Sequence, residues 1–176
     1  MGGDIGGSFA NIPLCNEPGQ TGCAVTYATY RATDVPMDGA LFGLASDETM
    51  QAGCRHPAAL GGGSAPLNGV YPLGSFGSFD TFVTGNRSPF ADPSLEAQIM
   101  TPFFSAPGLA QGECVSRGAF TYLEVTVTAD PEDPRADDIG GDILLPGWGL
   151  HLVDMNVALL DIELAIAQQI EGYLAQ

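Results

Sequence analysis

The pattern of apolar and polar positions changes near residue 119. Before it, short apolar pieces alternate with glycine- and proline-rich segments such as "ALGGGSAPLNG", "YPLGSFGSFD" and "FFSAPGLAQGE", which predicts a loop-rich segment over residues 1–118. Alternation in "AVTYATYR" predicts one strand over residues 24–31. "DETMQAG" and "SLEAQIM" predict short helical turns, with Asp47 and Ser94 as N-caps.

More regular structure is expected from residue 119 onward. "AFTYLEVTVTAD" alternates β-branched and aromatic residues, which predicts a strand that ends in the acidic turn "DPEDPRADDIGGD". Residues 154–175 predict the last helix, because apolar residues recur there at helical spacing. One stripe consists of Val157, Leu160, Leu164 and Ala167, with Leu159, Ile162, Ile166 and Ile170 beside it. So wide a stripe should pack on a sheet, yet only two strands are convincing, so part of the sheet is expected to be missing.

Composition and charge narrow the possible partners. A chain of 176 residues with 45% apolar content can form one domain with a real core. Its net charge of −16, from five arginines, no lysine and 21 acids, disfavours nucleic acid and anionic lipid as partners. No apolar run approaches the roughly 20 residues that cross a bilayer, and residues 1–13 do not resemble a signal peptide. No cofactor is expected.

The four cysteines, Cys15, Cys23, Cys54 and Cys114, predict two disulfides, because their spacing fits no common zinc pattern. Three pairings are possible. The favoured one joins Cys15 to Cys23 around "NEPGQTG" and leaves Cys54 for Cys114. Such bonds persist in the periplasm or outside the cell, so an extracytoplasmic location is expected although no signal peptide is present. A missing N-terminal part would reconcile the two.

The segment "WGLHLVDMN" places His151 on a glycine-flanked turn ahead of the last helix. The order strand, acidic turn, histidine and last helix is that of an α/β-hydrolase, in which an acid and a histidine converge on a serine. His151 is therefore predicted to be a general base. The alternative is a turn histidine with a surface hydrogen bond. His56, in "CRHPAAL", lacks this context and is expected to belong to a lid formed by the loop-rich segment.

The acid that would orient His151 is expected in the acidic turn after the strand. Asp133 is preferred and Asp130 comes second, with Asp137 and Asp138 as further candidates. The same turn permits a different hypothesis, in which its carboxylates and carbonyls bind calcium, although the spacing is not that of an EF-hand.

Several segments together resemble an uncharacterised bacterial family of α/β-hydrolase-like proteins, a domain of unknown function. They are "GGDIGGSFANIPLCNEPGQTGCAVTYATYRAT", "HPAALGGGSAPL", "DPEDPRADDIGGD" and "WGLHLVDMNVAL". The resemblance covers nearly the whole chain but only the C-terminal part of the family. It implies an α/β fold: a partial α/β-hydrolase core at 119–176 and, at 1–118, a large loop-rich lid insertion stapled by the cysteines.

The chain departs from that family because it contains no G-x-S-x-G nucleophile elbow; "GGSFA" at residues 6–10 is the nearest approach. It is therefore expected to be inactive alone and to act on small carboxylic esters when the missing N-terminal half of the core is supplied. A split hydrolase with a separately encoded partner is one alternative. Another is a secreted binding module whose aromatic residues line an apolar site: Tyr71, Phe76, Phe79, Phe82, Phe90, Phe103 and Phe104.

Overall fold

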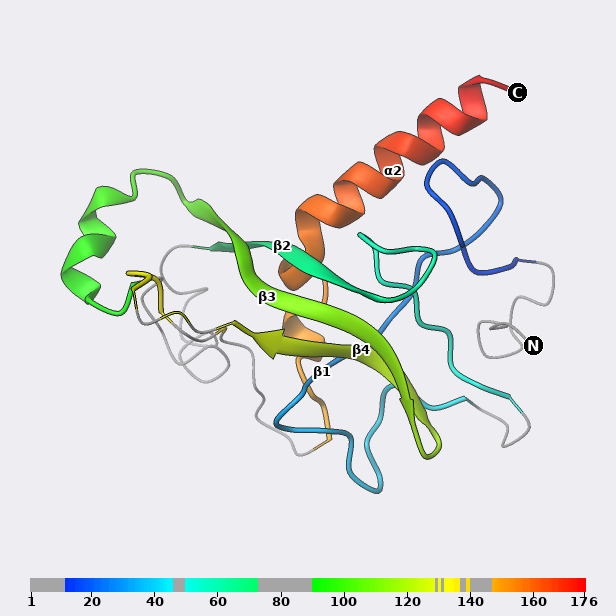
Figure 1. Ribbon diagram of the computed structural model, residues 1–176, viewed down its shortest axis with the longest axis horizontal. Helices are drawn as coiled ribbons and strands as arrows, with labels where there is room; N and C mark the ends of the chain where they lie inside the picture. The colour runs from blue at the N-terminus through cyan, green and yellow to red at the C-terminus, as the bar shows by residue number, and fades with distance from the viewer. Residues whose placement is uncertain are drawn as a thin grey trace.

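One mixed sheet forms the centre of the protein (Figure 1). The computed structural model describes residues 12–45, 50–72, 90–128, 130, 132–136, 139 and 147–176, and the statements below concern these residues. Their four strands are β1 (Thr29–Arg31), β2 (Ser64–Pro72), β3 (Phe103–Arg117) and β4 (Phe120–Val127). The strand order is β1-β4-β3-β2; β1 runs parallel to β4, and the other two pairs are antiparallel.

The long β3–β4 hairpin contains the strand that the sequence predicts most clearly. β4 lies within the segment of alternating β-branched and aromatic residues that predicts a strand over residues 119–130. The turn before β4 contains Gly118, which has a φ of 59°. The boundary expected at 118/119 falls in this turn, so strands from both predicted parts share one sheet.

β2 and β3 correct the prediction of a loop-rich segment. "FFSAPGLAQGE" was expected to be loop, yet it forms most of β3. Pro107 and Gly108, residues that usually interrupt a strand, lie at an irregularity in the pairing of β3 with β2. Leu67 pairs with Ala110 whereas the next residue, Asn68, pairs with Pro107. Gly108, between these two partners in β3, has a φ of 71°. An insertion of this kind accommodates proline and positive-φ glycine without ending the strand. The strand predicted over residues 24–31 is shorter than expected, because only Thr29–Arg31 joins the sheet.

The last helix begins later than predicted. Two short 3-10 helices, η2 (His151–Val153) and η3 (Asn156–Ala158), precede α2 (Leu159–Leu174). The turn predicted at "SLEAQIM" is the 3-10 helix η1 (Pro93–Gln98), and its N-cap is Asp92, whose carboxylate accepts from the N–H of Ser94. Asp47, the other predicted cap, lies outside the described residues.

The main core lies between the sheet and the segment of residues 150–158. Leu67, Leu123, Leu150 and Val157 are fully buried there, from β2, β4 and the approach to α2. A smaller cluster packs on the edge strand β1, where the rings of Tyr30 and Tyr122 meet edge to face at 5.2 Å. The hydroxyl of Tyr30 also lies 3.1 Å from the backbone oxygen of Gly147, so this cluster contacts the segment just before His151.

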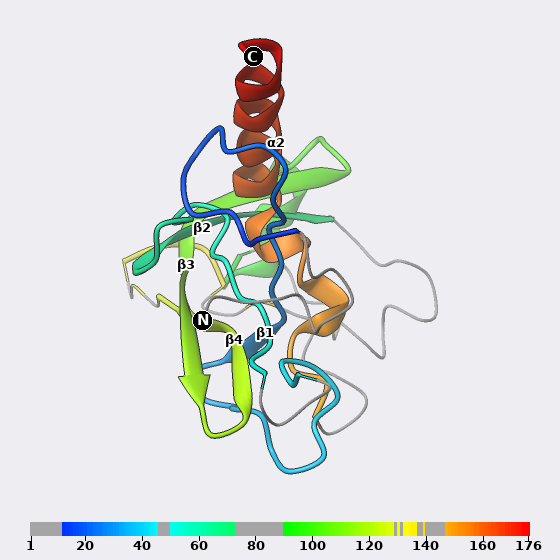
Figure 2. The same ribbon diagram turned by 90° about the vertical axis from the view of Figure 1, so that its right-hand side faces the viewer.

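The helix α2 extends beyond the sheet, and the loop of residues 12–24 lies beside its C-terminal half (Figures 1 and 2). The packed face of α2 consists of polar and small residues. Asp161 and Ala165 are buried there, and a side chain at Gly172 would collide with the backbone oxygen of Gly19. Most of the predicted apolar stripe is exposed instead, at Leu160, Leu164, Ile166 and Ile170. No described helix combines the length and apolarity that crossing a bilayer requires.

The favoured disulfide pairing is confirmed: Cys15 joins Cys23, and Cys54 joins Cys114. The first bond closes the loop beside α2. The second ties the segment before β2 to β3. Two disulfides are consistent with an extracytoplasmic location.

The two disulfides should contribute unequally to stability, because their closed loops span sequence separations of 60 and 8 residues. Loop-closure entropy predicts a loss of about 4 kcal/mol for Cys54→Ala/Cys114→Ala and about 2.5 kcal/mol for Cys15→Ala/Cys23→Ala. Equilibrium unfolding in urea of the two double variants measures both losses. A larger loss for the short-loop pair would contradict this order.

Candidate functional site

His151 and Asp154 form a hydrogen-bonded pair on one helical turn. Nδ1 of His151 lies 2.7 Å from Oδ2 of Asp154, three residues later. An ionised carboxylate only accepts hydrogen bonds, so Nδ1 carries the proton and donates it. The Asp154 side chain is 15% exposed and that of His151 is 40% exposed. The pair therefore has a covered acid and a solvent-accessible imidazole, and His151 Nε2 has no hydrogen-bond partner among the described residues.

The edge strand β1 fixes the acid of this pair. Both the N–H and the hydroxyl of Thr29 donate to Oδ1 of Asp154, the former at 3.0 Å, which leaves Oδ2 to His151. The hydroxyl of Tyr27 donates to the backbone oxygen of Asp154 at 3.1 Å. The oxygen of Thr29 in turn accepts from the N–H of Leu150 at 2.9 Å. β1 thus holds both ends of the turn that carries His151.

Close backbone approach at this turn requires glycine. Gly149 has a φ of 60°, and a Cβ there would lie 2.5 Å from the backbone oxygen of Thr29. Gly147 likewise has a positive φ, of 84°, and its oxygen accepts from the hydroxyl of Tyr30. The two glycines that precede the histidine in the sequence therefore allow the turn to lie directly against β1.

Two aromatic rings, those of Phe42 and Trp148, lie against the imidazole of His151. The ring of Phe42 stacks on His151 with centroids 3.7 Å apart, and Trp148 meets His151 edge-on at 6.0 Å. Phe42 and Trp148 also pack on each other at 5.8 Å. The stacked face of the imidazole is therefore closed, and its orientation is set by both the ring contact and the bond to Asp154.

Burial raises the pKa of Asp154 above its ordinary value, whereas the bonds from Thr29 and His151 oppose this shift by stabilising the charged form. Burial also raises the pKa of Tyr27, beside the carboxylate, so this hydroxyl stays neutral at pH 7. The imidazole of His151 is the basic group that Asp154 contacts, through Nδ1. Such a carboxylate orients a base and stabilises its protonated form.

The structure brings neither Asp133 nor Asp130 into a bond with His151. Asp133 accepts from the guanidinium and the N–H of Arg135, and these bonds lower its pKa. Asp130 caps its own turn by accepting from the N–H of Glu132 at 3.0 Å. The acid that sequence reasoning missed is Asp154, and the signal was the spacing H-x-x-D, which places both side chains on one face of a helical turn.

The calcium hypothesis stays a prediction, because Asp137 and Asp138 of the acidic turn lie outside the described residues. Among the described residues, no three or more His, Cys, Asp or Glu side chains form a group that could hold a metal ion. Of the seven aromatic residues expected to line an apolar site, Phe76, Phe79 and Phe82 also lie outside. Tyr71 and Phe104 pair with each other at 5.8 Å and pack against the core.

His56 is a structural residue. It is 1% exposed, its Nδ1 accepts from the N–H of Ala58 at 3.0 Å, and its Nε2 therefore donates to the oxygen of Ala65 at 3.1 Å. Both ring nitrogens are occupied in the neutral form. A second proton would break the bond to Ala58, and burial lowers the pKa of His56.

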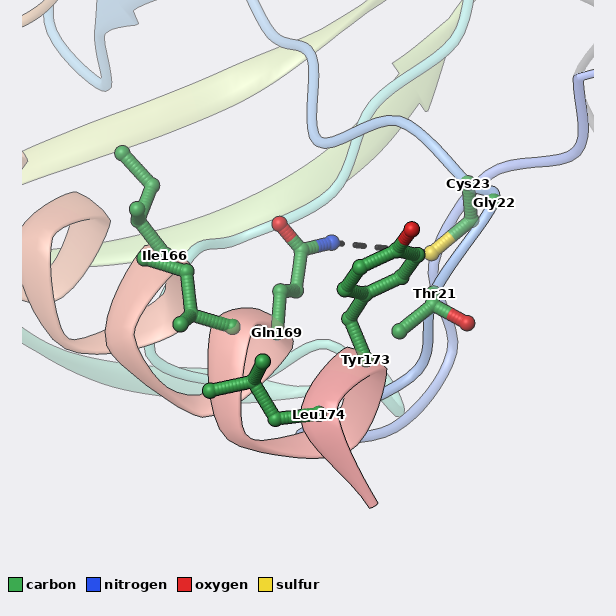
Figure 3. Close-up of a pocket in the computed structure, with 8 residues that line it drawn as sticks. Thr21, Gly22, Cys23, Ile166, Gln169, Tyr173 and Leu174 are labelled. Atoms are coloured by element: carbon green, nitrogen blue, oxygen red, sulfur yellow. Dashed lines mark hydrogen bonds between the residues drawn. The ribbon is translucent and has the colours of Figure 1, made fainter. Parts of the chain in front are cut away.

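A shallow pocket of about 280 Å³ lies far along α2, between its last turns and the Cys15–Cys23 loop (Figure 3). Its lining is Thr21, Gly22, Cys23, Ile166, Gln169, Ile170, Tyr173 and Leu174. The amide of Gln169 points to Cys23 and also donates to the oxygen of Gln20 at 3.2 Å. The residues that line this pocket include no carboxylate, imidazole or free thiol.

Comparison with known proteins found no relative: no family model, curated protein or solved structure matches the chain. The resemblance to α/β-hydrolase-like proteins therefore stays an expectation.

His56 should make the protein less stable in mild acid. Its pKa is lowered in the fold from an ordinary value of 6.5, so the unfolded chain binds the proton first. The stabilisation is complete above pH 6.5 and is lost as pH falls from there through the folded-state pKa, by at most about 1.4 kcal/mol per pH unit. Urea unfolding between pH 7.5 and 5 measures this slope. A free energy of unfolding that does not fall over this range would contradict the assignment to His56.

Proposed function

We propose that His151 is the general base of a serine hydrolase that cleaves carboxylic esters, and that Asp154 is the acid that orients it. The observation that carries the proposal is the bond between His151 Nδ1 and the covered carboxylate of Asp154, with Nε2 left for a reacting group. This is the division of roles between acid and histidine in a catalytic triad.

The chemistry requires one proton to move in each half of the reaction. In the first half Nε2 takes the proton of the serine hydroxyl as it attacks the ester carbonyl, and returns it to the leaving alkoxide, which leaves the acyl group on the serine. In the second half Nε2 takes a proton from the attacking water and returns it to the serine oxygen as the carboxylic acid leaves. Asp154 stabilises the imidazolium formed in between. Its carboxylate keeps the neutral imidazole in the tautomer with the lone pair on Nε2.

The nucleophile comes from outside the described residues. The four cysteines are disulfide-bonded, and no described serine or threonine bonds to His151. Since the sequence contains no G-x-S-x-G elbow, we place the serine in a segment joined N-terminally to this chain or in a partner chain, as the resemblance implies. An extracytoplasmic esterase of this kind agrees with the two disulfides.

The test uses the product of the entire open reading frame that contains this sequence, assayed with p-nitrophenyl butyrate. His151→Gln and Asp154→Asn should each lower kcat by about 10⁴-fold, because the first removes the base and the second removes its orientation. The matched controls are Asp133→Asn and Asp130→Asn, which remove the same charge at carboxylates that do not contact His151. Both should keep kcat within about threefold of wild type.

The outcomes separate the candidate acids. Loss of activity in Asp133→Asn with activity retained in Asp154→Asn would show that Asp133, in the turn after β4, orients His151 and that Asp154 does not. Ester turnover that survives His151→Gln would end the hydrolase proposal, because no other described imidazole is available: His56 is buried and bonded at both nitrogens.

A further inference from the structure

Thr29 bonds to the acid of the candidate pair, Asp154, and not to the base, His151. Its N–H and its hydroxyl both donate to Oδ1 of Asp154, and Oδ2 alone faces His151. Thr29 itself is 1% exposed and lies in β1, paired with Leu123 of β4. The donors therefore belong to the rigid sheet, whereas acid and base belong to a short helical turn.

We propose that Thr29 is the positioning residue of this pair: by holding Oδ1 it directs Oδ2 to His151 and so selects the Nδ1–H tautomer of the imidazole. The tautomer itself does not depend on catalysis, but its consequence for ester hydrolysis depends on the function proposed above.

The geometry supports this role because a carboxylate does not orient itself. The last torsion of an aspartate has a broad, two-fold energy profile, so the two oxygens exchange easily unless donors distinguish them. Two donors from one residue converge on Oδ1, and only a residue with a short hydroxyl side chain can supply both from a strand. Among the described residues, Tyr27 and Tyr30 are the further titratable groups that interact with Asp154, and burial raises the pKa of both, so neither supplies a competing charge at neutral pH.

The experiment compares Thr29→Val with Thr29→Ser in this chain. Valine keeps the size and β-branching of threonine but lacks the hydroxyl, whereas serine keeps the hydroxyl. Long-range proton–nitrogen correlation spectra, recorded over rising pH until the His151 signals stop moving, give the tautomer of neutral His151. Wild type and Thr29→Ser should be mainly Nδ1–H. In Thr29→Val the Nδ1–H form should lose its majority to Nε2–H.

Tyr27→Phe controls for general loosening of the turn. It removes the bond from the Tyr27 hydroxyl to the backbone oxygen of Asp154 and leaves the carboxylate untouched. Its tautomer should match wild type. A tautomer change in Tyr27→Phe as large as in Thr29→Val would overturn the proposal, and so would a wild-type tautomer in Thr29→Val.

A measurement on the wild type covers the case in which Thr29→Val does not fold. Because the Thr29 N–H bonds directly to Asp154, its amide proton resonance should move in the same acid step as the carboxyl carbon of Asp154. A Thr29 amide proton whose chemical shift stays constant through this step would overturn the proposal. Failure here is distinct from failure of the hydrolase: ester turnover that survives His151→Gln ends the enzymatic proposal and leaves the tautomer result standing.

Discussion

The contact between β1 and the turn of residues 149–154 determines how the rest of the protein is arranged. Thr29 accepts from Leu150 and donates twice to Asp154, while Gly149 permits the backbones to meet. Because β1 is only three residues long and pairs along one side with β4, its backbone groups on the other side need these partners. The same bonds that complete the sheet edge therefore bury Leu150, aim the chain toward α2 and present His151 to solvent.

The two histidines show how surroundings decide the capability of one residue type. His56 is enclosed, and its two nitrogens satisfy one backbone donor and one backbone acceptor, so a charge on it would cost both desolvation and a hydrogen bond. His151 has one nitrogen bonded to a carboxylate, one face covered by Phe42 and the remainder exposed. The first arrangement leaves neither ring nitrogen available, whereas the second leaves Nε2 accessible, which is the geometry that a general base requires.

The sequence predicted the parts whose signal is local. The alternation of residues 119–130 and the position of His151 before the last helix could be read directly, whereas the disulfide pairing was only the favoured one of three. The structure contains the strand, both bonds and the helix. β3 could not be read, because Pro107 and Gly108 break a strand unless a neighbour tolerates an irregularity, and only pairing with β2 shows that. Asp154 was overlooked because the acid was sought after a strand, whereas its partnership depends on a helical turn and on Thr29, which lies 125 residues earlier.

The register of α2 illustrates why hydrophobic periodicity alone could not place the helix. Periodicity predicts that Leu160, Leu164 and Ile170 face the sheet, yet these are exposed, and Asp161 is buried. Asp161 accepts from the N–H and the side-chain amide of Asn68, at 2.8 and 2.6 Å, where the irregularity in β2 leaves that backbone group free of the ladder. Any rotation of the helix would leave both a covered carboxylate and a strand N–H unpaired, at a cost of several kcal/mol. Directional bonds thus set the orientation of α2 and leave its apolar stripe on the surface of the described protein.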